Sequence, residues 1–338
     1  MTAATATKTL GLIGLGWLTP LFKLATGDDP KGNLRDFARQ LGVPLLAILV
    51  FLALWAGLAP RIQTSLGEIP GPVQVAEQFA NLHADHMRTL EKKAQFLAMQ
   101  EKINAKKLAK DPTAEVTIRP YTGAPTYYEQ ILTSLKTVFM GFLLGSIIAV
   151  PLGVVCGMSK TMNAAFNPLI QIFKPVSPLA WLPLVTMMVS ALYVSDDPMF
   201  DKSFLTSAIT VTLCSLWPTL INTAVGVASI DKDLVNVGKV LRLSPWTKVT
   251  KLILPSALPY IFTGLRLSLG VGWMVLIAAE MLAQNPGLGK FVWDEFQNGS
   301  SQSLAKIMVA VFTIGIIGFL LDRVMMALQT VVSHGDVR

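Results

Sequence analysis

Residues 241–270 read LRLSPWTKVTKLILPSALPYIFTGLRLSLG, and the two halves of this stretch differ in character. The first half mixes the basic residues Arg242, Lys248 and Lys251 with apolar residues, whereas the second half carries no charge apart from Arg266. An apolar run of about 20 residues is the length that crosses the hydrocarbon core of a bilayer. The stretch therefore predicts a membrane span that is entered directly from a basic, half-apolar segment.

The composition of the whole chain agrees with a membrane protein. Of its 338 residues, 52% are hydrophobic and only 14% are charged, and the mean hydropathy is +0.53. Soluble domains carry about 25% charged residues, so this chain has too little polar surface for a water-soluble fold. Cys156 and Cys214 both fall within apolar runs, which favours small buried side chains over a disulfide or a metal site. The predicted fold class is an all-α integral membrane protein.

Six apolar runs are long enough to span the membrane. The first covers residues 41–59, and the other five are predicted near Leu132–Cys156, Val176–Tyr193, Phe204–Ala228, Leu258–Leu282 and Leu304–Leu328. These spans divide the chain into an interfacial segment on the cytoplasmic face, the first span, an extended periplasmic segment with a helix near 86–110, a five-helix core and a cytoplasmic tail. The corresponding residues are 1–40, 41–59, 60–130, 131–330 and 331–338.

Basic residues in the short loops determine the predicted orientation. The short outer loops are mainly acidic, while the loop between the fourth and fifth spans carries Lys232, Lys239, Arg242, Lys248 and Lys251. Positive side chains are retained on the cytoplasmic side, so we expect both termini in the cytoplasm of a bacterial inner membrane. The lysines near residues 85–110 lie in a long loop, where this rule is weak, and they do not decide the side.

The cytoplasmic loop at residues 231–256 has two interpretations. Ser244 and Pro245 supply an N-cap and a first-turn proline for a short helix, and Pro255 and Pro259 are expected to break the chain path as it turns into the membrane. One interpretation is a surface helix whose lysines contact anionic lipid. The other is a docking element, a rigid amphipathic projection that fits a groove on a cytoplasmic partner.

The stretch NVGKVLRLSPWTKVTKLILPSALPYIFTGLRLSLG (236–270) resembles the EAA coupling loop of type I ABC importer permeases. In that family the coupling helix fits a cleft of the ATPase subunit. Leu252, Leu254 and Pro255 stand where the family has its I-x-L-P motif. The resemblance implies a MetI-like fold and favours the docking interpretation.

The other end of the loop departs from the family pattern. Asn236, Val237 and Gly238 replace the usual E-A-A triplet, and Arg242 stands where the family has a glycine. On this resemblance the residues expected to couple to the ATPase are Asn236, Gly238, Arg242, Ser244, Pro245, Trp246, Lys248, Leu254 and Pro255.

Three further stretches resemble the nitrate, bicarbonate, sulfonate and taurine branch of these permeases. They are FKPVSPLAWLPL (173–184), LPYIFTGLRLSLGVGWMVLIAAEMLAQNPGLGKFVWDEF (258–296) and FLLDRVM (319–325). The runs SPLAWLPL and GVGWM are most similar to nitrate-type permeases. This resemblance implies the permease subunit of an importer for nitrate or nitrite, with bicarbonate, cyanate and sulfonate or taurine as alternative substrates.

The same resemblance implies the partners. They are a second permease copy, two cytoplasmic ATPase subunits that bind ATP and Mg²⁺, a periplasmic or lipid-anchored substrate-binding protein and membrane lipid, without nucleic acid. The chain itself has no nucleotide-binding loop, because GLGKF (287–291) lacks the spacing and the Ser/Thr of that motif. We therefore expect no catalytic residue and no cofactor bound by this chain. His83 and His86 flank Asp85 without a further ligand cluster, which predicts a solvated helix instead of a metal site.

Three residues are candidates for the translocation path. Arg266 lies roughly 15 Å into the fifth span, at about 1.5 Å per residue from the cytoplasmic prolines. A central arginine costs about 2.5–3.5 kcal/mol on insertion scales, so Arg266 is expected to face the bundle interior or a watery cavity. It could bind a small oxyanion through its planar guanidinium, or lock carbonyl groups at a helix break. Trp181 could line the route or anchor its span, and Glu280 could act as a gate or a packing partner. Asp322 and Arg323 are expected to form an interfacial pair.

Two other transporter classes stay open at this stage. An ion-coupled secondary carrier usually shows internal repeats and intramembrane acids, whereas this chain shows no clear repeat and Glu280 is the acid well within a predicted span. A passive anion channel would not need ATPase partners, so dependence of uptake on those partners separates it from an importer.

Overall fold

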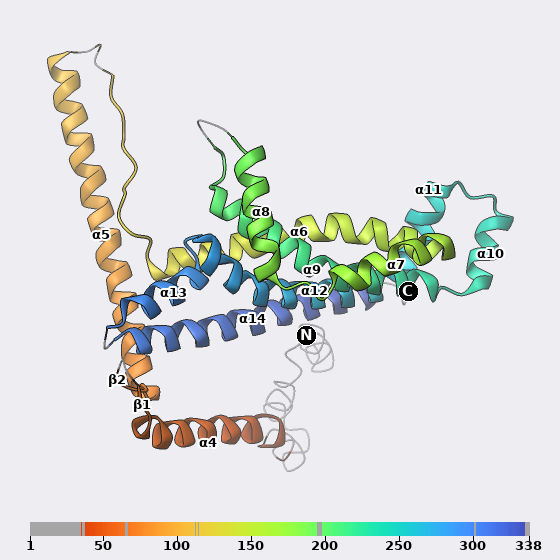
Figure 1. Cartoon of the computed structure of the whole chain (residues 1–338), viewed down its shortest axis with the longest axis horizontal. Helices are drawn as coiled ribbons and strands as arrows, with labels where there is room; N and C mark the ends of the chain where they lie inside the picture. The colour runs from red at the N-terminus through yellow and green to blue at the C-terminus, as the bar shows by residue number, and fades with distance from the viewer. Residues whose placement is uncertain are drawn as a thin grey trace, which may run out of the picture.

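Long apolar helices dominate the computed structural model, which describes residues 35, 38–64, 67–111, 113, 115–194, 198–300 and 302–334 (Figure 1). In the described residues the only strands, β1 (Gln63–Thr64) and β2 (Gly67–Glu68), form a small antiparallel hairpin. The helices in chain order are η2 (Ala38–Gly42), α4 (Val43–Leu58), η3 (Ala59–Arg61), α5 (Pro72–Lys110), α6 (Tyr127–Met158), α7 (Lys160–Phe173), α8 (Pro178–Leu192), α9 (Lys202–Ala228), α10 (Lys232–Val240), α11 (Pro245–Lys248), η4 (Val249–Ile253), α12 (Leu254–Ala283), α13 (Leu288–Asn298) and α14 (Ser303–His334).

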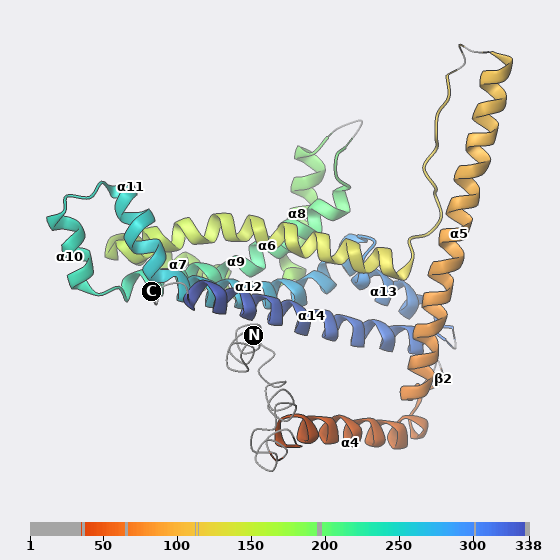
Figure 2. The same cartoon turned by 180° about the vertical axis from the view of Figure 1, so that it is seen from behind.

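Five continuous helical segments are long and apolar enough to cross a membrane. In the described part of the chain they are Ala38–Arg61, Tyr127–Met158, Lys202–Ala228, Pro245–Ala283 and Ser303–Val332. Figures 1 and 2, which view the molecule from opposite sides, both show α6, α9, α12 and α14 running along one common direction. The predicted all-α membrane fold is confirmed.

The third predicted span, Val176–Tyr193, is not one straight helix. Its place is taken by α7 and α8, which together are apolar enough to span but meet at an angle of 100°. Pro175 has no N–H to continue α7, and Pro178 begins α8 at its first position, so the helix stops between them. If the bent pair counts as one span, the total reaches the predicted six. The predicted loop after the second span is largely helical, because Ser159 caps α7 by accepting a hydrogen bond from the Met162 amide.

α9 is the central helix of the bundle and packs against α6 and α12. Its buried positions are rich in threonine and serine. The hydroxyl groups of Thr210, Thr212 and Thr219 have partners on the same or the next helix, whereas three others have none in the described structure, namely those of Ser207, Ser215 and Thr223. Thr212 donates to the carbonyl of Ala208 one turn earlier and to that of Gly141 on α6. The Thr219 hydroxyl lies 2.7 Å from the Ser268 hydroxyl of α12. These small side chains let the three backbones approach closely, as membrane helices commonly do.

Glycines on α6 complete the contact with α9. A Cβ atom at Gly153 would lie 2.6 Å from the Thr223 Cβ and 2.8 Å from the Leu220 carbonyl oxygen. A Cβ at Gly141 would lie 2.7 Å from the Ala208 carbonyl oxygen. A Cβ atom cannot approach other atoms so closely. The two helices can therefore pack at their observed separation only because positions 141 and 153 are glycines.

The two ends of the bundle carry different projections. α10 and α11 extend from one end, whereas α5, α13 and the β1–β2 hairpin lie at the other (Figures 1 and 2). α4 has no buried residue and contacts the bundle through Trp55, whose ring centroid lies 5.2 Å from that of Phe312. In the predicted orientation the α10–α11 end is cytoplasmic and the α5 end is outside.

Several predicted boundaries shift. The outer helix expected near 86–110 begins much earlier, because Pro72 suits the first helical position and the Gln74 side chain accepts a hydrogen bond from the Gly71 amide. α14 continues to His334, so the predicted tail at 331–338 is helical where it is described. Residues 335–338 and most of the predicted interfacial segment at 1–40 lie outside the described residues.

The glycine contact between α6 and α9 gives a first prediction. We expect Gly153→Ala to lower the free energy of unfolding by about 1–3 kcal/mol, because the added methyl group overpacks the interface. The matched control is Gly315→Ala on α14, where a Cβ meets nothing within 4 Å. Both changes raise helix propensity by the same amount, so the difference between them isolates the packing cost. Thermal unfolding in detergent measures it, and equal stability of the two variants would contradict the proposed contact.

Candidate functional site

The α10–α11 projection is the first candidate site. α10 and α11 are joined by a turn at residues 241–244 and stand clear of the bundle (Figures 1 and 2). The Ser244 hydroxyl accepts a hydrogen bond from the Thr247 amide, and Pro245 occupies the start of α11, as predicted. The Trp246 side chain on this short helix is 76% exposed. A large exposed aromatic residue on a capped, rigid turn is typical of a protein contact.

The turn that precedes α11 explains one departure from the family pattern. Arg242 has φ +47°, in the left-handed region that favours glycine. The Leu243 amide donates to the Gly238 carbonyl at 3.1 Å, which is the six-to-one hydrogen bond of a Schellman helix end. The position therefore requires the conformation that a glycine adopts most easily, and the arginine adopts it at some cost. This backbone geometry explains why the family has a glycine at this position, and a role of Arg242 in coupling stays a prediction.

The projection is rooted in the bundle by apolar residues. Ile253, Ala257 and Ile261 are buried together with Val154 of α6 and Val227 of α9. The end of the segment that continues into α12 is therefore fixed to the bundle, while Trp246, seven residues before Ile253, stays exposed. Residues 231–253, from here on called the knob, therefore project from the bundle on an apolar base.

The expected break at Pro255 and Pro259 is wrong. Residues 245–283 form one continuous helical segment, in which Pro255 falls at the start of α12 and Pro259 lies inside it. The π-helical stretch η4 directly precedes Pro255, and such widened turns accommodate a local disturbance of the hydrogen-bond ladder. The Pro259 carbonyl accepts a hydrogen bond from the Thr263 hydroxyl at 2.9 Å. The knob is thus joined to the membrane span by helix, without an intervening loop.

Arg266 forms the second candidate site together with Asp322 of α14. Its Nε and Nη2 atoms both donate to the Asp322 carboxylate, the latter at 2.8 Å. The expected pair of Asp322 with Arg323 is not formed, because Arg323 lies over the ring of Phe319 instead, 4.9 Å from its centroid. Asp322 and Arg266 are 56 residues apart, so no local pattern could reveal this pairing.

The Arg266–Asp322 pair lies in an open depression of about 660 Å³. Both side chains keep about a third of their surface exposed, 34% for Arg266 and 37% for Asp322. The depression lies between α12 and α14 and is lined by Thr263, Arg266, Leu267, Gly270, Val271, Met274, Asp322 and Gln329. A half-open site that holds an ion pair between two membrane spans suits a water-filled route.

Glu280 lies elsewhere, fully buried near the outer end of α12. The Ser134 hydroxyl donates to its carboxylate, with oxygen distances of 2.8 and 2.9 Å, and the Gly289 amide donates at 3.0 Å. Ser134 also accepts a hydrogen bond from the Leu288 amide at 2.8 Å. The carboxylate thus joins α6 to the turn between α12 and α13. This geometry is that of a packing partner.

Two glycines in the turn after Glu280 allow the backbone to approach the Glu280 carboxylate, and they are the feature of the sequence that could have indicated this contact. A Cβ atom at Gly287 would collide with the Glu280 carboxylate, and one at Gly289 would collide with the Ile277 carbonyl. The stretch NPGLG (285–289) therefore has glycine where the turn closes over the buried acid. Asn285, which donates to the Thr137 hydroxyl at 3.1 Å, is a further contact residue that the sequence did not single out.

Trp181 lies on α8, just after the bend from α7. Its ring centroid is 5.7 Å from that of Phe173, and its indole N–H is buried without a hydrogen-bond partner in the described structure. It is not among the residues that line the depression at Arg266. In the described residues no group of three His, Cys, Asp or Glu side chains could hold a metal ion. His83 and His86 instead contact Tyr128 and Thr126 at the start of α6.

Comparison with known proteins identifies the chain as a transporter component. Residues 141–335 match the family described as binding-protein-dependent transport system inner membrane component. The chain belongs to this family. The match contains α9, the knob and both halves of the Arg266–Asp322 pair. The protein is therefore a multi-pass permease subunit of the inner membrane.

Three relatives show the branch of the family to which this permease is similar. The nitrate import permease protein NrtB of Synechococcus elongatus is 36% identical over 204 residues, 60% of this chain and 69% of that protein. The bicarbonate transport system permease protein CmpB of Synechocystis is 39% identical over 208 residues, 61% of this chain and 69% of that protein. The CmpB protein of Synechococcus elongatus is 31% identical over 313 residues, covering 90% of this chain and 94% of that protein.

A solved structure supports the fold of the permease. The methionine ABC transporter MetNI, in an inward-facing conformation, matches with a TM-score of 0.52 at 14% sequence identity. The match covers 61% of this chain and 95% of the MetNI chain. At this identity the likeness concerns the fold alone, and it confirms the expected type I importer architecture.

A double-mutant cycle tests the Arg266–Asp322 pair. We expect Arg266→Leu and Asp322→Leu each to lower the free energy of unfolding by about 2–3 kcal/mol, because each leaves one charge unpaired in the membrane. The double variant should lose less than the sum of the two by at least about 1 kcal/mol. Thermal unfolding in detergent is the measurement, with Arg323→Leu as the control for loss of a nearby arginine. Strictly additive losses would show that the two side chains do not interact.

Proposed function

We propose that this chain is the membrane-spanning subunit of an ATP-driven importer that moves a small anion, nitrate or nitrite first, into the cell. The observation that supports this most directly is the rigid knob at residues 231–253, which presents Trp246 at one end of the bundle. Its sequence resembles the coupling loop of type I importers, and its shape suits insertion into a groove on a cytoplasmic partner. ATP and Mg²⁺ would be bound by two ATPase subunits, so this chain needs no catalytic residue.

The continuous helix explains how the knob acts on the membrane region. Residues 245–283 run unbroken from Trp246 past Arg266 to the buried turn at Glu280. Because no loop separates the knob from the span, a shift of the knob driven by ATPase closure is carried directly into α12 and toward the middle of the membrane. Such a switch needs two packed states of the spans and a partner that binds them differently.

A second copy of the chain completes the proposed path. Leu267 and Met274 lie seven residues apart on α12 and are exposed to 51% and 70%. They flank the depression at Arg266, which a second copy packed against this face would enclose. The path then lies between two permeases. Of the three candidates only Arg266 lines this depression, while Trp181 and Glu280 lie elsewhere and act in packing.

The paired charge of Arg266 favours movement of an anion past this site over tight binding of the anion. Because the Asp322 carboxylate already holds two of its donors, the pair offers an anion only a weak net attraction. A site along a route must bind weakly enough for the ion to leave. Selection of the anion would therefore rest with a separate substrate-binding protein that delivers it from outside, with both termini of this chain in the cytoplasm.

Bicarbonate is the second candidate substrate. The relative that covers 90% of this chain is a bicarbonate permease, and the nitrate relatives match a shorter part. Nothing in the depression distinguishes the two anions, since both are small, planar and singly charged. An ion-coupled carrier is less well supported, because the two acids within the spans, the buried Glu280 and the partly exposed Asp322, are both engaged by fixed partners.

Coupled ATP hydrolysis tests the proposal. The permease is reconstituted with its ATPase subunits and binding protein, and hydrolysis is compared with nitrate, bicarbonate and taurine. We expect stimulation by nitrate, reduced about tenfold or more by Trp246→Ala, because central aromatic contacts contribute about 2 kcal/mol or more to an interface. Phe296→Ala is the matched control, since Phe296 is 60% exposed on α13 at the opposite end of the bundle.

Each outcome has a defined meaning. Stimulation by bicarbonate alone would keep the importer and replace the substrate. Equal loss in the Trp246 and Phe296 variants would remove the knob from coupling. Anion flux that persists without ATPase subunits would replace the importer with a carrier or a channel.

A further inference from the structure

The outer arm, defined as α5 with the return segment at residues 115–125, is not used by the proposed coupling or path. α5 has 39 residues, so at about 1.5 Å per residue it is roughly 58 Å long. It runs nearly at right angles to the spans, and its distal half extends beyond the bundle (Figures 1 and 2). An exposed helix of this length needs contacts of its own to keep a fixed position.

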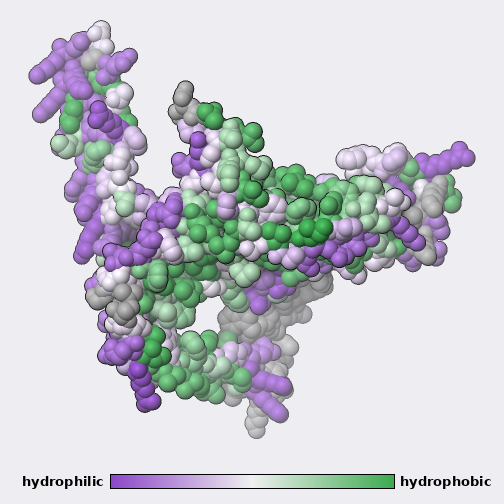
Figure 3. All heavy atoms as spheres, viewed as in Figure 1, coloured by the Kyte–Doolittle hydropathy of each residue, from purple (hydrophilic) through white to green (hydrophobic). Residues whose placement is uncertain are grey.

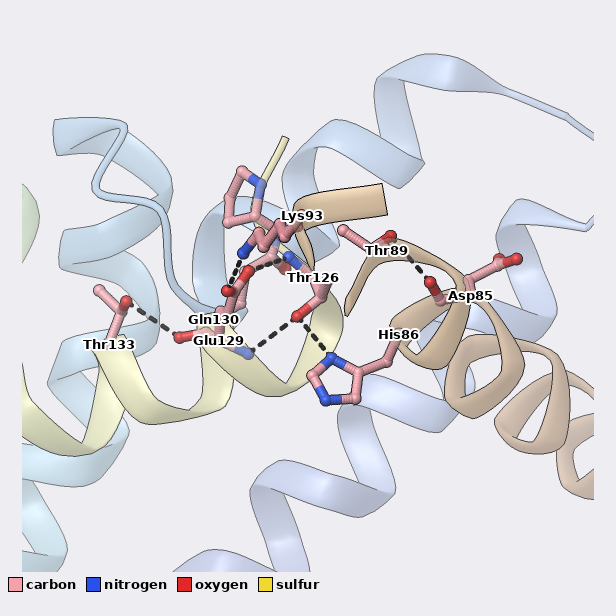
Figure 4. Close-up of polar contacts among 9 residues, drawn as sticks. Asp85, His86, Thr89, Lys93, Thr126, Glu129, Gln130 and Thr133 are labelled. Atoms are coloured by element: carbon pink, nitrogen blue, oxygen red, sulfur yellow. Dashed lines mark hydrogen bonds and ion pairs between the residues drawn. The ribbon is translucent and has the colours of Figure 1, made fainter. Parts of the chain in front are cut away.

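The base of the arm is fixed to the start of α6. The Thr126 hydroxyl caps α6 and contacts the His86 ring nitrogen of α5 at 2.9 Å (Figure 4). The Glu129 carboxylate accepts hydrogen bonds from the Thr126 amide, at 2.8 Å, and from Lys93 of α5. His83 contacts the Tyr128 hydroxyl one turn earlier. The direction in which the arm leaves the bundle is thus determined by charged and polar contacts.

The distal half of the arm is held by the return segment. The Gln100 side chain exchanges two hydrogen bonds with the Arg119 backbone, at 2.7 and 2.9 Å. The Phe96 ring packs edge-on against Tyr121, with centroids 5.6 Å apart. Lys93, Phe96, Gln100 and Asn104 are the half-buried residues of this half, and their spacing places them on one helix face. That face points to the return segment, which runs between α5 and the bundle (Figures 1 and 2).

The opposite face of the distal half is basic. Lys102, Lys106 and Lys110 recur every four residues and are exposed, and none forms an ion pair in the described part of the chain. Asp111 does not neutralise them, because its carboxylate accepts hydrogen bonds from the Thr113 amide and hydroxyl. These bonds lower the pKa of Asp111. Figure 3 shows hydrophilic side chains along the edge of the arm that faces away from the bundle.

This charge pattern does not stabilise the arm itself. Like charges four residues apart on a helix are destabilising, so the three lysines weaken the turns that carry them. Their direction also argues against a bilayer contact, because the return segment covers the side of α5 that faces the bundle. The stripe points into the aqueous space outside the membrane. A soluble partner with an acidic surface is the chemistry that fits it.

We propose that Lys102, Lys106 and Lys110 form a docking stripe for an acidic surface of the soluble substrate-binding protein. This inference rests on the proposed importer function and assigns the arm a role in it. Exposed Met99 and Ile103 lie three residues before Lys102 and Lys106, on the same face of the helix, and supply apolar contact area. The stripe steers the loaded binding protein to the outer end of the bundle, and its attraction is screened by salt.

Binding of the purified substrate-binding protein to the full permease–ATPase complex in nanodiscs tests this role. We expect the variant with Lys102→Glu, Lys106→Glu and Lys110→Glu to bind at least tenfold more weakly at low ionic strength. The difference from wild type should shrink in high salt. Basal ATP hydrolysis should stay unchanged, because all three side chains are exposed and distant from the knob. The stimulation of ATP hydrolysis by the substrate-binding protein should fall in parallel with the affinity of that protein for the complex.

A single-residue comparison provides the matched control. Lys106→Glu should weaken binding, whereas Lys107→Glu should not, because Lys107 lies about 100° around the helix and seven residues after Gln100, on the side of the return segment. Both variants make the same change of charge in the same exposed turn.

The outcomes separate this inference from the proposed function. Unchanged affinity in the triple variant, with wild-type binding intact, would overturn the docking stripe and leave the importer standing. An effect that depends on anionic lipid in the nanodisc, without a change in protein affinity, would overturn it in favour of a lipid contact. A wild-type complex that binds no substrate-binding protein would overturn both.

Discussion

The helix from Pro245 to Ala283 is the feature on which the remaining arrangement depends. A membrane interior offers no water to backbone N–H and C=O groups, so a span keeps its own hydrogen bonds or finds substitutes for them. Here a π-helical stretch directly before Pro255 accommodates the first proline, and the helix continues through Pro259. As a result, the exposed Trp246 at the bundle end, Arg266 in mid-span and the buried Glu280 carboxylate at the far end lie on one continuous helical segment.

Polar groups inside the bundle have separate structural tasks. Glu280 is enclosed by Ser134 and the amide groups of a glycine-rich turn, and it joins α12 to α6 and α13. Arg266 is half-exposed, and its charge is balanced by Asp322 of α14. Both satisfy the rule that an ionisable residue within a membrane protein needs a partner or a wet cavity. Only the second lies where an ion could pass, because only it borders an open depression.

The projections at the two ends of the molecule suit different partners. The knob is a compact turn rooted in apolar packing and presents an aromatic residue, which suits a tight contact that transmits movement. The outer arm is long, held by hydrogen bonds and basic on its free face, which suits encounter and release. An importer needs both kinds of contact, since its ATPase stays attached while a delivery protein comes and goes.

The sequence alone determined the class of the fold, the approximate spans and the position of the knob. These properties follow from local patterns, namely apolar runs, a Ser-Pro cap and a short motif, which act over a few residues and are readable without neighbours. The tertiary structure decided the rest. It bent the third span between α7 and α8, carried the fifth span through Pro255 and Pro259, and paired Arg266 with a residue 56 positions away. It also placed Glu280 against Ser134, 146 positions away. Partners at such separations are chosen by how helices pack, and packing is a property of the folded chain that no window of sequence contains.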